Sequence, residues 1–528
     1  MSEKKFLSSK SIKSLIPLII IIVIGLIIRI AMMPGPSTWH DGARIIDLAH
    51  KFLIGDLDLF NEGTFGFRFF EYIPVSLSIL AFGLNDFSII LPNLILSLAT
   101  IILAYKLTFL IMPRVEIALL SAFFIAIFPL EIIYATNLTL DVASSFFISL
   151  SLYMVLYTFK KENETMSQQR MNLSYLLLGV FAGVAFEIRE MSIMVLPFLA
   201  ILLFYDLYKG TLTKKHVILK YAIMAIGFAS MVGVELFFCL LLTGYPLLRY
   251  WFYFGIGWGP EGMAGSVEFG YIGIREGVTS LSNYPEAMIY PDLLLGYSFY
   301  ILFFVLVILL LKKGSFETNS RKLILLTMVW ITAILLYLQF GTWQPFEWTL
   351  FEKQTRFLLS ISLPLWAINS IGIWKLVDNG GEIDPGRYTK RMNNYLPLFA
   401  ILTLVIVSNA FFVVEARSTL VDGPSEEVYN YLATQPILTT YAYSMVYALE
   451  YYFDYNHPSL VELVNGTVVQ NNSYVVIEEN QWNPGFPQNL EYLDMTNWTL
   501  LHTIRSLRVS PYPKGRSYNY STYIYYVA

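Results

Sequence analysis

Long apolar runs separated by short polar segments make up most of the chain up to Val414. Nine of these runs are long enough to cross the roughly 30 Å hydrocarbon core of a bilayer as helices of about 20 residues. They are Leu15 to Met33, Phe87 to Ile111, Val115 to Tyr134, Leu140 to Phe159, Val217 to Leu242, Tyr290 to Leu311, Leu323 to Phe340, Phe357 to Trp374 and Leu396 to Val414. Two shorter runs, Leu173 to Ile188 and Met191 to Tyr205, are predicted to meet at a polar hairpin around Arg189. The pattern predicts a mainly α-helical bundle of about eleven transmembrane spans.

The segment from Ser37 to Asp56 follows the first run directly and is too polar to continue across the bilayer. After Asp41 its apolar residues recur at helical spacing, which predicts a helix on the membrane surface with one apolar face. These residues are Ala43, Ile46, Leu48, Ala49, Phe52 and Leu53. A further run, Tyr72 to Gly83, has about a dozen residues and is too short to span. It is predicted to lie beside the first helix in the outer interface.

Lysine and arginine are unevenly distributed among the loops, and this bias predicts the orientation of the protein. With a cytoplasmic N-terminus, every basic cluster falls in a cytoplasmic loop. The clusters are Lys106 and Arg114; Lys160, Lys161 and Arg170; Lys209, Lys214, Lys215 and Lys220; Lys312, Lys313, Arg321 and Lys322; and Lys375, Arg387, Lys390 and Arg391. Eleven spans then place everything after Val414 outside. We expect a multi-pass protein of the cell membrane whose active site and C-terminus are extracytoplasmic.

The composition changes after Val414, where Asn, Tyr, Ser and Pro replace the runs of Leu and Ile. We therefore divide the chain into a transmembrane domain, residues 1–414, and a soluble extracytoplasmic domain, residues 415–528. In the second domain, PILTTY, SYVVIEEN, WTLLHTI and YIYYVA are typical of short strands, and Ala442 to Phe453 is predicted to be helical. These elements indicate a small α/β fold.

The overall composition supports the membrane assignment. Of 528 residues, 56% are apolar and 14% are charged, whereas about a quarter are charged in an average globular protein. The formal net charge of -4 and the lack of a basic tract with interleaved aromatics exclude nucleic acid as an expected partner. The single cysteine, Cys239, lies in an apolar run and is interpreted as a core residue.

Three acids on the predicted outer face are candidate catalytic residues. Asp41 begins the surface helix, Glu71 lies in FRFFEYIP, and Asp141 begins a span. A positioned carboxylate can take a proton from an acceptor hydroxyl during transfer. Each acid also has a structural interpretation, because Asp41 and Asp141 suit helix N-caps and Glu71 can pair with Arg68. The residues alone leave both interpretations open.

Four basic residues on the same face are candidate ligands for an anionic group such as phosphate. They are Arg189, Arg249, Lys353 and Arg356. Planar guanidinium groups bind phosphate oxygens through paired hydrogen bonds. The alternative is that these bases only extend to lipid headgroups from the ends of spans. No HExxH motif, Walker motif or His pair at ligand spacing is present, so no metal or other cofactor is assigned.

These residues lie in segments that resemble GT-C type glycosyltransferases of family 39, the group of protein O-mannosyltransferases and aminoarabinose lipid A transferases. HDGARIIDLAHKFLIGD is similar to the family's acidic motif after the first span, and FRFFEYIPVSLSILAFG to the segment that follows. PLEIIYATNLTLDVASSFF resembles the second outer loop, with Asp141 at its recurrent acid. GVAFEIREMSIMVLPF, LLTGYPLLRY and KQTRFLLSISLPL resemble later stretches that end in Arg189, Arg249 and Arg356.

The chain departs from the family pattern at three places. Gly42 stands where the second acid of the first motif is common, and Tyr72 stands where aminoarabinose transferases usually have lysine. No histidine occurs between Tyr245 and Tyr290, where those enzymes place a zinc ligand. A divalent metal therefore remains an open question in the sequence.

The resemblance implies a donor in which a sugar is linked through phosphate to a polyprenol, and a protein, lipid or glycan acceptor at the membrane. It implies direct displacement with inversion, in which Asp41 is the general base, Glu71 and Asp141 stabilise the sugar, and the bases stabilise the leaving phosphate. The main alternative is a secondary transporter of a lipid or anionic solute. Transporters carry ionisable groups near the bilayer midplane and often contain repeats, whereas these charges lie on one face and no repeat is seen.

Overall fold

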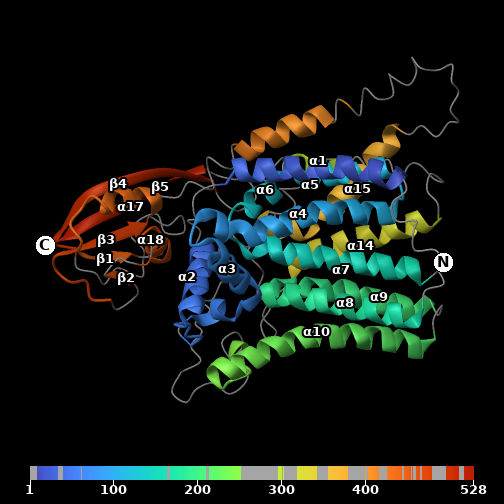
Figure 1. Ribbon diagram of the computed structural model, residues 1–528, viewed down its shortest axis with the longest axis horizontal. Coiled ribbons are helices and arrows are strands. Elements are labelled where there is room, and N and C mark those ends of the chain that lie inside the picture. The colour runs from blue at the N-terminus through green and yellow to red at the C-terminus, as the bar shows by residue number, and fades with distance from the viewer. Residues whose placement is uncertain are drawn as a thin grey trace.

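A computed structural model describes most of the chain. The described residues are 9–33, 40–60, 62–162, 167–209, 213–250, 295–299, 301–302, 318–341, 355–377, 399, 402–414, 425–442, 445–453, 455, 459–463, 467–478, 495–509 and 517–528. They form a mainly helical bundle and a small C-terminal domain with a mixed β-sheet (Figure 1). Seven of the described helices are long and apolar enough to cross a membrane, or eight if one bent pair counts as a span.

Most of the described residues in the predicted transmembrane segments are helical. The bundle consists of α1 (Ser9–Ala31), α4 (Asp86–Ile111), α5 (Val115–Ala126), α6 (Pro129–Ala135), α7 (Leu140–Lys161), α8 (Gln168–Ile188), η2 (Glu190–Met194), α9 (Val195–Lys209), α10 (Lys214–Thr243), α14 (Thr318–Phe340), η3 (Thr355–Leu358), α15 (Leu359–Val377) and a helix over Leu402–Val414. Most of the predicted span from Tyr290 to Leu311 lies outside the described residues. The total of eleven spans therefore stays a prediction.

One predicted span is broken. The run from Val115 to Tyr134 forms two helices, α5 and α6, whose axes differ by 54°. The break follows from Pro129 at the start of α6, because proline has no N–H group to donate to the carbonyl four residues earlier. It sets the direction of the chain just before the loop that leads to α7.

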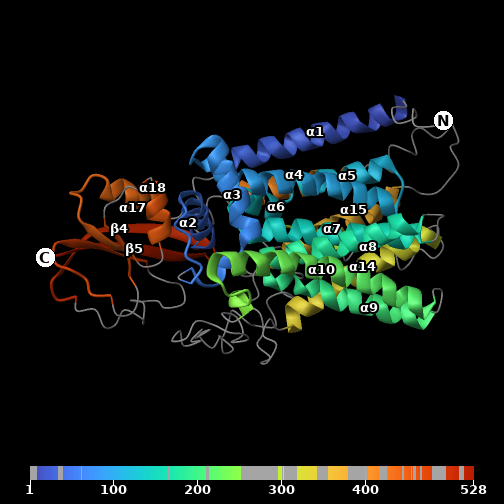
Figure 2. The same cartoon turned by 60° about the horizontal axis from the view of Figure 1, so that its bottom comes forward.

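The predicted surface helix is present as α2 (His40–Ile54), and the short apolar run forms α3 (Phe69–Phe82), with the 3-10 helix η1 (Gly63–Phe67) between them. Figures 1 and 2 show α2 and α3 at one end of the bundle, next to the C-terminal domain. The apolar face of α2 is buried inside the protein, because α3 packs on one side of it and the C-terminal helix α18 (Val446–Tyr452) on another. The expectation that this face rests on the membrane is corrected accordingly.

The C-terminal domain contains the four predicted strands and two elements that were not predicted, β2 and α17. Its elements are α17 (Ser425–Leu432), β1 (Thr439–Ala442), α18, β2 (Leu460–Glu462), β3 (Ser473–Glu478), β4 (Trp498–Val509) and β5 (Ser517–Val527). The strand order is β2-β1-β3-β5-β4, with β1 parallel to both neighbours and β5 antiparallel to both of its own. Val428, Leu449 and Val476 form part of the core between α17, α18 and the sheet.

The domain contacts the bundle end through α18 and the residues after it. The His50 ring of α2 stacks on Tyr455, with centroids 3.9 Å apart. The Tyr451 hydroxyl donates to Asp86 Oδ1 in the first turn of α4, at 2.6 Å. These contacts hold α2 between the bundle and the domain.

Glycines allow helices α8 and α10 to pack closely. A Cβ atom on Gly179 would lie 2.0 Å from the Met224 carbonyl oxygen, and one on Gly227 would lie 2.3 Å from the Leu176 carbonyl oxygen. Gly183 lies one helical turn after Gly179 and faces the same helix. Small residues at four-residue spacing are a common basis of helix packing in membranes, where backbones approach closely.

We expect Gly179→Ala to lower the thermal unfolding temperature in detergent, because the added methyl group must push two backbones apart. Overpacking of this kind costs about 1 to 3 kcal/mol. Gly233→Ala is the matched control, since Gly233 is a helical glycine of α10 where an added methyl group would meet no neighbouring atom within 4 Å. An equal melting temperature for Gly179→Ala and wild type would contradict the close contact of α8 and α10.

Candidate active site

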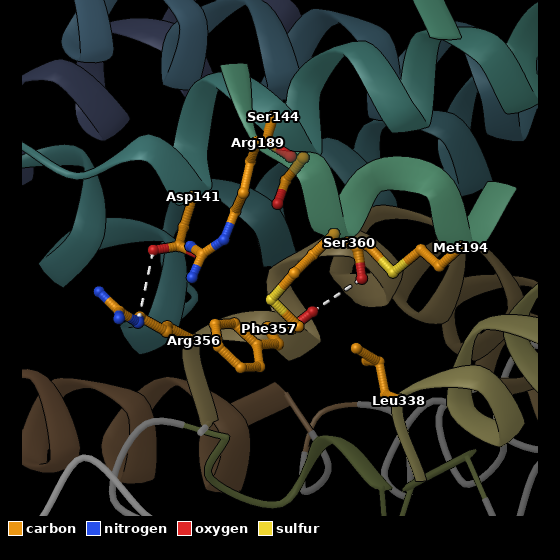
Figure 3. Close-up of a pocket in the computed structure, with 10 residues that line it drawn as sticks. Asp141, Ser144, Arg189, Met194, Leu338, Arg356, Phe357 and Ser360 are labelled. Atoms are coloured by element: carbon orange, nitrogen blue, oxygen red, sulfur yellow. Dashed lines mark hydrogen bonds and ion pairs between the residues drawn. The ribbon is translucent and has the colours of Figure 1, made fainter. Parts of the chain in front are cut away.

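Asp141 lies in the first turn of α7, at the end of the bundle next to α3. Its side chain is buried, with 3% of the residue exposed. The carboxylate forms an ion pair with Arg189, and its Oδ2 atom lies 3.7 Å from Arg356 Nε (Figure 3). A carboxylate in the first turn also interacts favourably with the helix dipole. The Asp141 side chain is thus surrounded by two arginines and lies at the positive end of the helix dipole.

The two arginines come from breaks between helices. Arg189 separates α8 from η2, and Arg356 lies in η3, directly before α15. Their guanidinium carbons lie 4.5 Å and 5.6 Å from the centroid of the Phe357 ring, which orders both side chains by cation–π contact. Together with Asp141 the arginines carry an excess of one positive charge. Such a cluster favours an incoming anion.

A pocket lies between α7, η2, α14 and α15 at this cluster, as Figure 3 shows. It has an empty volume of about 240 Å³, part of it open to solvent. It is lined by Asp141, Ser144, Ser145, Arg189, Met191, Met194, Leu338, Arg356, Phe357 and Ser360. One wall is charged or polar and the other is apolar. This suits a ligand with an anionic group and an apolar part.

Glu71 lies near this cluster on α3. The residue is 3% exposed, and the charges of Arg68, Asp141 and Arg189 all act on its carboxyl group. Burial, which disfavours the charged form, raises the pKa of Glu71 to about 8. The structure therefore places Glu71 close to Asp141 and Arg189, although Glu71 does not line the pocket.

Arg249 belongs to a different cluster and does not line the pocket. Its guanidinium contacts three carboxylates, those of Glu187 at 2.7 Å, Glu190 at 2.7 Å and Glu235 at 3.3 Å. Only 1% of the Arg249 side chain is exposed. Glu187 and Glu190 lie on either side of Arg189 in the sequence, so this second cluster also holds the break between α8 and η2.

The remaining predicted site residues are placed only in part. Asp41 is in the first turn of α2, and its side chain lies outside the described residues. Lys353 lies outside the described residues altogether. In the part of the chain that the structure describes, no three His, Cys, Asp or Glu side chains are grouped to hold a metal ion.

Residues 70–233 match the family model described as dolichyl-phosphate-mannose-protein mannosyltransferase. The match covers about a third of the chain, and it indicates a membrane glycosyltransferase of the class that depends on polyprenyl-phosphate sugars. Glu71, Asp141 and Arg189 fall within the matched segment, whereas Arg356 lies beyond it. A search of curated proteins finds no match.

Solved structures share the fold of this chain. ArnT from Cupriavidus metallidurans is 13% identical with a TM-score of 0.56, and the match covers 96% of this chain and 97% of ArnT. ArnT has also been solved bound to undecaprenyl phosphate, with the same scores. The oligosaccharyltransferase AglB from Archaeoglobus fulgidus is 13% identical with a TM-score of 0.52, over 84% of this chain and 64% of AglB. These matches support the fold and the multi-pass arrangement.

Sequence reasoning missed several residues of the pocket. Ser144 and Ser145 lie one turn after Asp141, and Ser360 lies one turn after Arg356, so they line the pocket by helical spacing alone. The Ser144 and Ser192 hydroxyls are hydrogen-bonded at 2.8 Å, which joins α7 to η2. Small hydroxyl residues are common in apolar helices. Only their spacing from a predicted charged residue offered a signal.

Proposed function

We propose that the protein transfers a sugar from a polyprenyl-phosphate donor to an acceptor at the outer membrane face, with inversion at the anomeric carbon. The observation that carries this proposal is the position of Asp141 between Arg189 and Arg356 at a half-apolar pocket. Charged groups within a membrane protein are costly to bury and mark functional sites. The acceptor is a protein, lipid or glycan.

The two arginines suit the leaving group. In the transfer, the bond between the anomeric carbon and a phosphate oxygen breaks, and negative charge builds on the polyprenyl phosphate. Arg189 and Arg356 would stabilise that charge through hydrogen bonds that are already oriented by Asp141 and Phe357. The apolar wall formed by Met191, Met194 and Leu338 would face the first part of the polyprenol.

The acids suit the other half of the reaction. The acceptor oxygen attacks the anomeric carbon as its proton passes to a general base, and Asp41 at the start of α2 is the candidate for that base. The sugar gains positive charge in the transition state. Asp141 lies at the pocket and would stabilise that charge, with Glu71 close to it.

The function is tested by incubating purified protein with a panel of labelled polyprenyl-phosphate sugars and candidate acceptors. We expect at least one donor to lose its sugar to an acceptor while unlabelled polyprenyl phosphate accumulates. The same assay in vesicles separates the transporter alternative, which would move the intact labelled lipid across the bilayer. Transport without sugar transfer would contradict the proposal.

The outward orientation rests on the one-sided basic loops and on the location of the candidate site at the end of the bundle next to the C-terminal domain. We expect a membrane-impermeant thiol reagent added to intact cells to label Asn471→Cys and not Asn163→Cys. The background reaction is low because the native Cys239 is buried. Equal labelling of both positions would exclude the proposed topology.

The pKa of Glu71 predicts a pH dependence. Its folded-state pKa of about 8 lies above the usual value of 4.5, so the buried neutral acid stabilises the protein fully below pH 4.5 and loses this effect as the pH rises through about 8. If the neutral carboxyl group donates a hydrogen bond to the substrate, kcat/KM falls over the same upper range. We expect Glu71→Gln, which keeps a donor, to remove this loss at high pH. Persistence of the loss in Glu71→Gln would assign it to another group.

A further inference from the structure

Arg29 lies on α1 and is completely buried within the bundle, with 0% of the residue exposed. Its Nε atom donates to Ser97 Oγ on α4 at 2.8 Å. Its Nη1 atom donates to two carbonyl oxygens, Gly25 at 3.1 Å and Ala126 at 3.0 Å. A guanidinium group at such a depth is costly, and it is retained in membrane proteins where it has a specific task.

The Ala126 bond places Arg29 at the break between α5 and α6. Ala126 is the last residue of α5, so its carbonyl oxygen has no partner within that helix. Arg29 supplies the missing donor from a different helix. The bend of 54° at this point is thus held by a side chain 97 residues away in the sequence.

The same network continues into α6. The Ser97 hydroxyl donates to Glu131 Oε1 at 2.9 Å, so this serine links Arg29 to an acid in the first turn of α6. Glu131 is 2% exposed and lies with Arg29 rather than with Asp141. The guanidinium and carboxylate compensate each other's charge through the serine.

A second side chain of α4 holds the loop that follows α6. The Asn93 Nδ2 atom donates to the Thr139 carbonyl oxygen at 3.0 Å. Asn93 lies one helical turn before Ser97, and Thr139 is the N-cap residue directly before α7, two positions before Asp141. One face of α4 therefore fixes both the start of α6 and the end of the loop that leads to Asp141.

We propose that Arg29 is a positioning residue for the transfer reaction. Through Ser97 and Glu131 it sets the break between α5 and α6 and the direction of the loop after α6. This loop leads to Asp141, which lies between the two arginines. This inference rests on the function proposed above. Arg189 directly precedes η2 and Arg356 lies in η3, and the bonds of the Arg29 network do not reach either arginine. Loss of the network moves the Asp141 carboxylate, whereas the Phe357 ring and the breaks between helices still hold the two arginines.

The alternative is that the network only stabilises the bundle. Replacing a buried ion pair by apolar or neutral groups of similar size is often neutral or stabilising, whereas removing one partner leaves a costly unpaired charge. The informative variant is therefore the double substitution Arg29→Met with Glu131→Gln, which removes both charges. The matched control is Lys220→Met with Asp206→Asn and Glu162→Gln, because Lys220 is also buried and pairs with both acids, at 2.9 Å and 2.7 Å.

The experiment measures thermal unfolding, the Kd for polyprenyl phosphate and kcat on each purified variant. We expect the Arg29/Glu131 variant to fold and to bind polyprenyl phosphate within about twofold of wild type, while kcat falls at least about tenfold, since a misplacement of about 1 Å can reduce a rate a hundredfold. The control variant should keep its kcat. A folded Arg29/Glu131 variant with normal kcat, or equal losses of kcat in both variants, would overturn the inference.

The two proposals fail in different ways. If the wild-type protein neither binds polyprenyl phosphate nor transfers a sugar, the proposed function fails before any variant is made. If the wild type is active and the Arg29/Glu131 variant shows a weaker Kd with unchanged kcat, only the positioning role is excluded. An unfolded double variant alongside a folded control shows that the network is a structural requirement of the bundle, which also overturns the inference.

Discussion

Replacing Asp41 with asparagine is expected to slow sugar transfer at least about a hundredfold while leaving folding and donor binding close to wild type. Loss of a general base usually reduces a rate by about a hundredfold to ten-thousandfold. Asparagine has the same size as aspartate, and Asp41 is the second residue of α2, so the fold of the variant loses only a small interaction with the helix dipole and the start of α2 should be preserved. The side chain loses only its ability to accept the acceptor's proton.

Transfer rate and donor affinity should be measured on the same purified protein. Asp47→Asn is a suitable control, because Asp47 lies on the same helix and forms a salt bridge of 2.8 Å with Lys51. Its substitution removes a carboxylate from α2 without removing the candidate base, so it should affect stability more than kcat. Transfer by Asp41→Asn at a near-normal rate would limit Asp41 to a structural role at the helix start.

Substitution of Arg189 or Arg356 with alanine is expected to raise the donor concentration needed for half-maximal transfer at least about thirtyfold. Losing one partner of a buried, hydrogen-bonded charge pair costs about 2 kcal/mol or more, which corresponds to that factor. Lysine should restore the function only in part, because it keeps the charge and loses the planar fork that binds two phosphate oxygens. Both variants should show the effect, since both arginines contact Asp141 at the pocket.

The donor concentration needed for half-maximal transfer is measured by titrating the donor against four variants, Arg189→Ala, Arg189→Lys, Arg356→Ala and Arg356→Lys. Arg170→Ala is the matched control. Arg170 is exposed near the start of α8, whereas Arg189 directly follows the other end of that helix. Arg249→Ala belongs in the same series. As a phosphate ligand it would raise the donor requirement, whereas as the centre of three carboxylates it would chiefly lower the unfolding temperature. Unchanged titrations for Arg189→Ala and Arg356→Ala would show that these bases do not bind the donor.

The properties that depend on local sequence were predicted by the sequence alone. The apolar runs indicated membrane helices, because a helix must cover the hydrocarbon core with apolar side chains whatever its neighbours are. The helical spacing after Asp41 indicated α2, and four short segments typical of strands indicated β1, β3, β4 and β5 of the C-terminal domain. The family resemblance also came from short motifs within single segments. The matched family segment, residues 70–233, confirms it.

The pairing of charges was decided by the tertiary structure. Glu131 lies in the same quoted motif as Asp141, but the fold links it to Arg29 through Ser97. Arg29 lies within an apolar run and was not singled out, and its partners Ser97 and Ala126 are 68 and 97 positions away. Likewise Arg249 meets Glu187, Glu190 and Glu235, whereas Arg189 meets Asp141. Hydropathy determines that a helix spans the membrane. The partner of a buried charge depends instead on which helices pack together and on how each helix is rotated about its axis. Both are set by contacts between distant segments, such as α8 and α10.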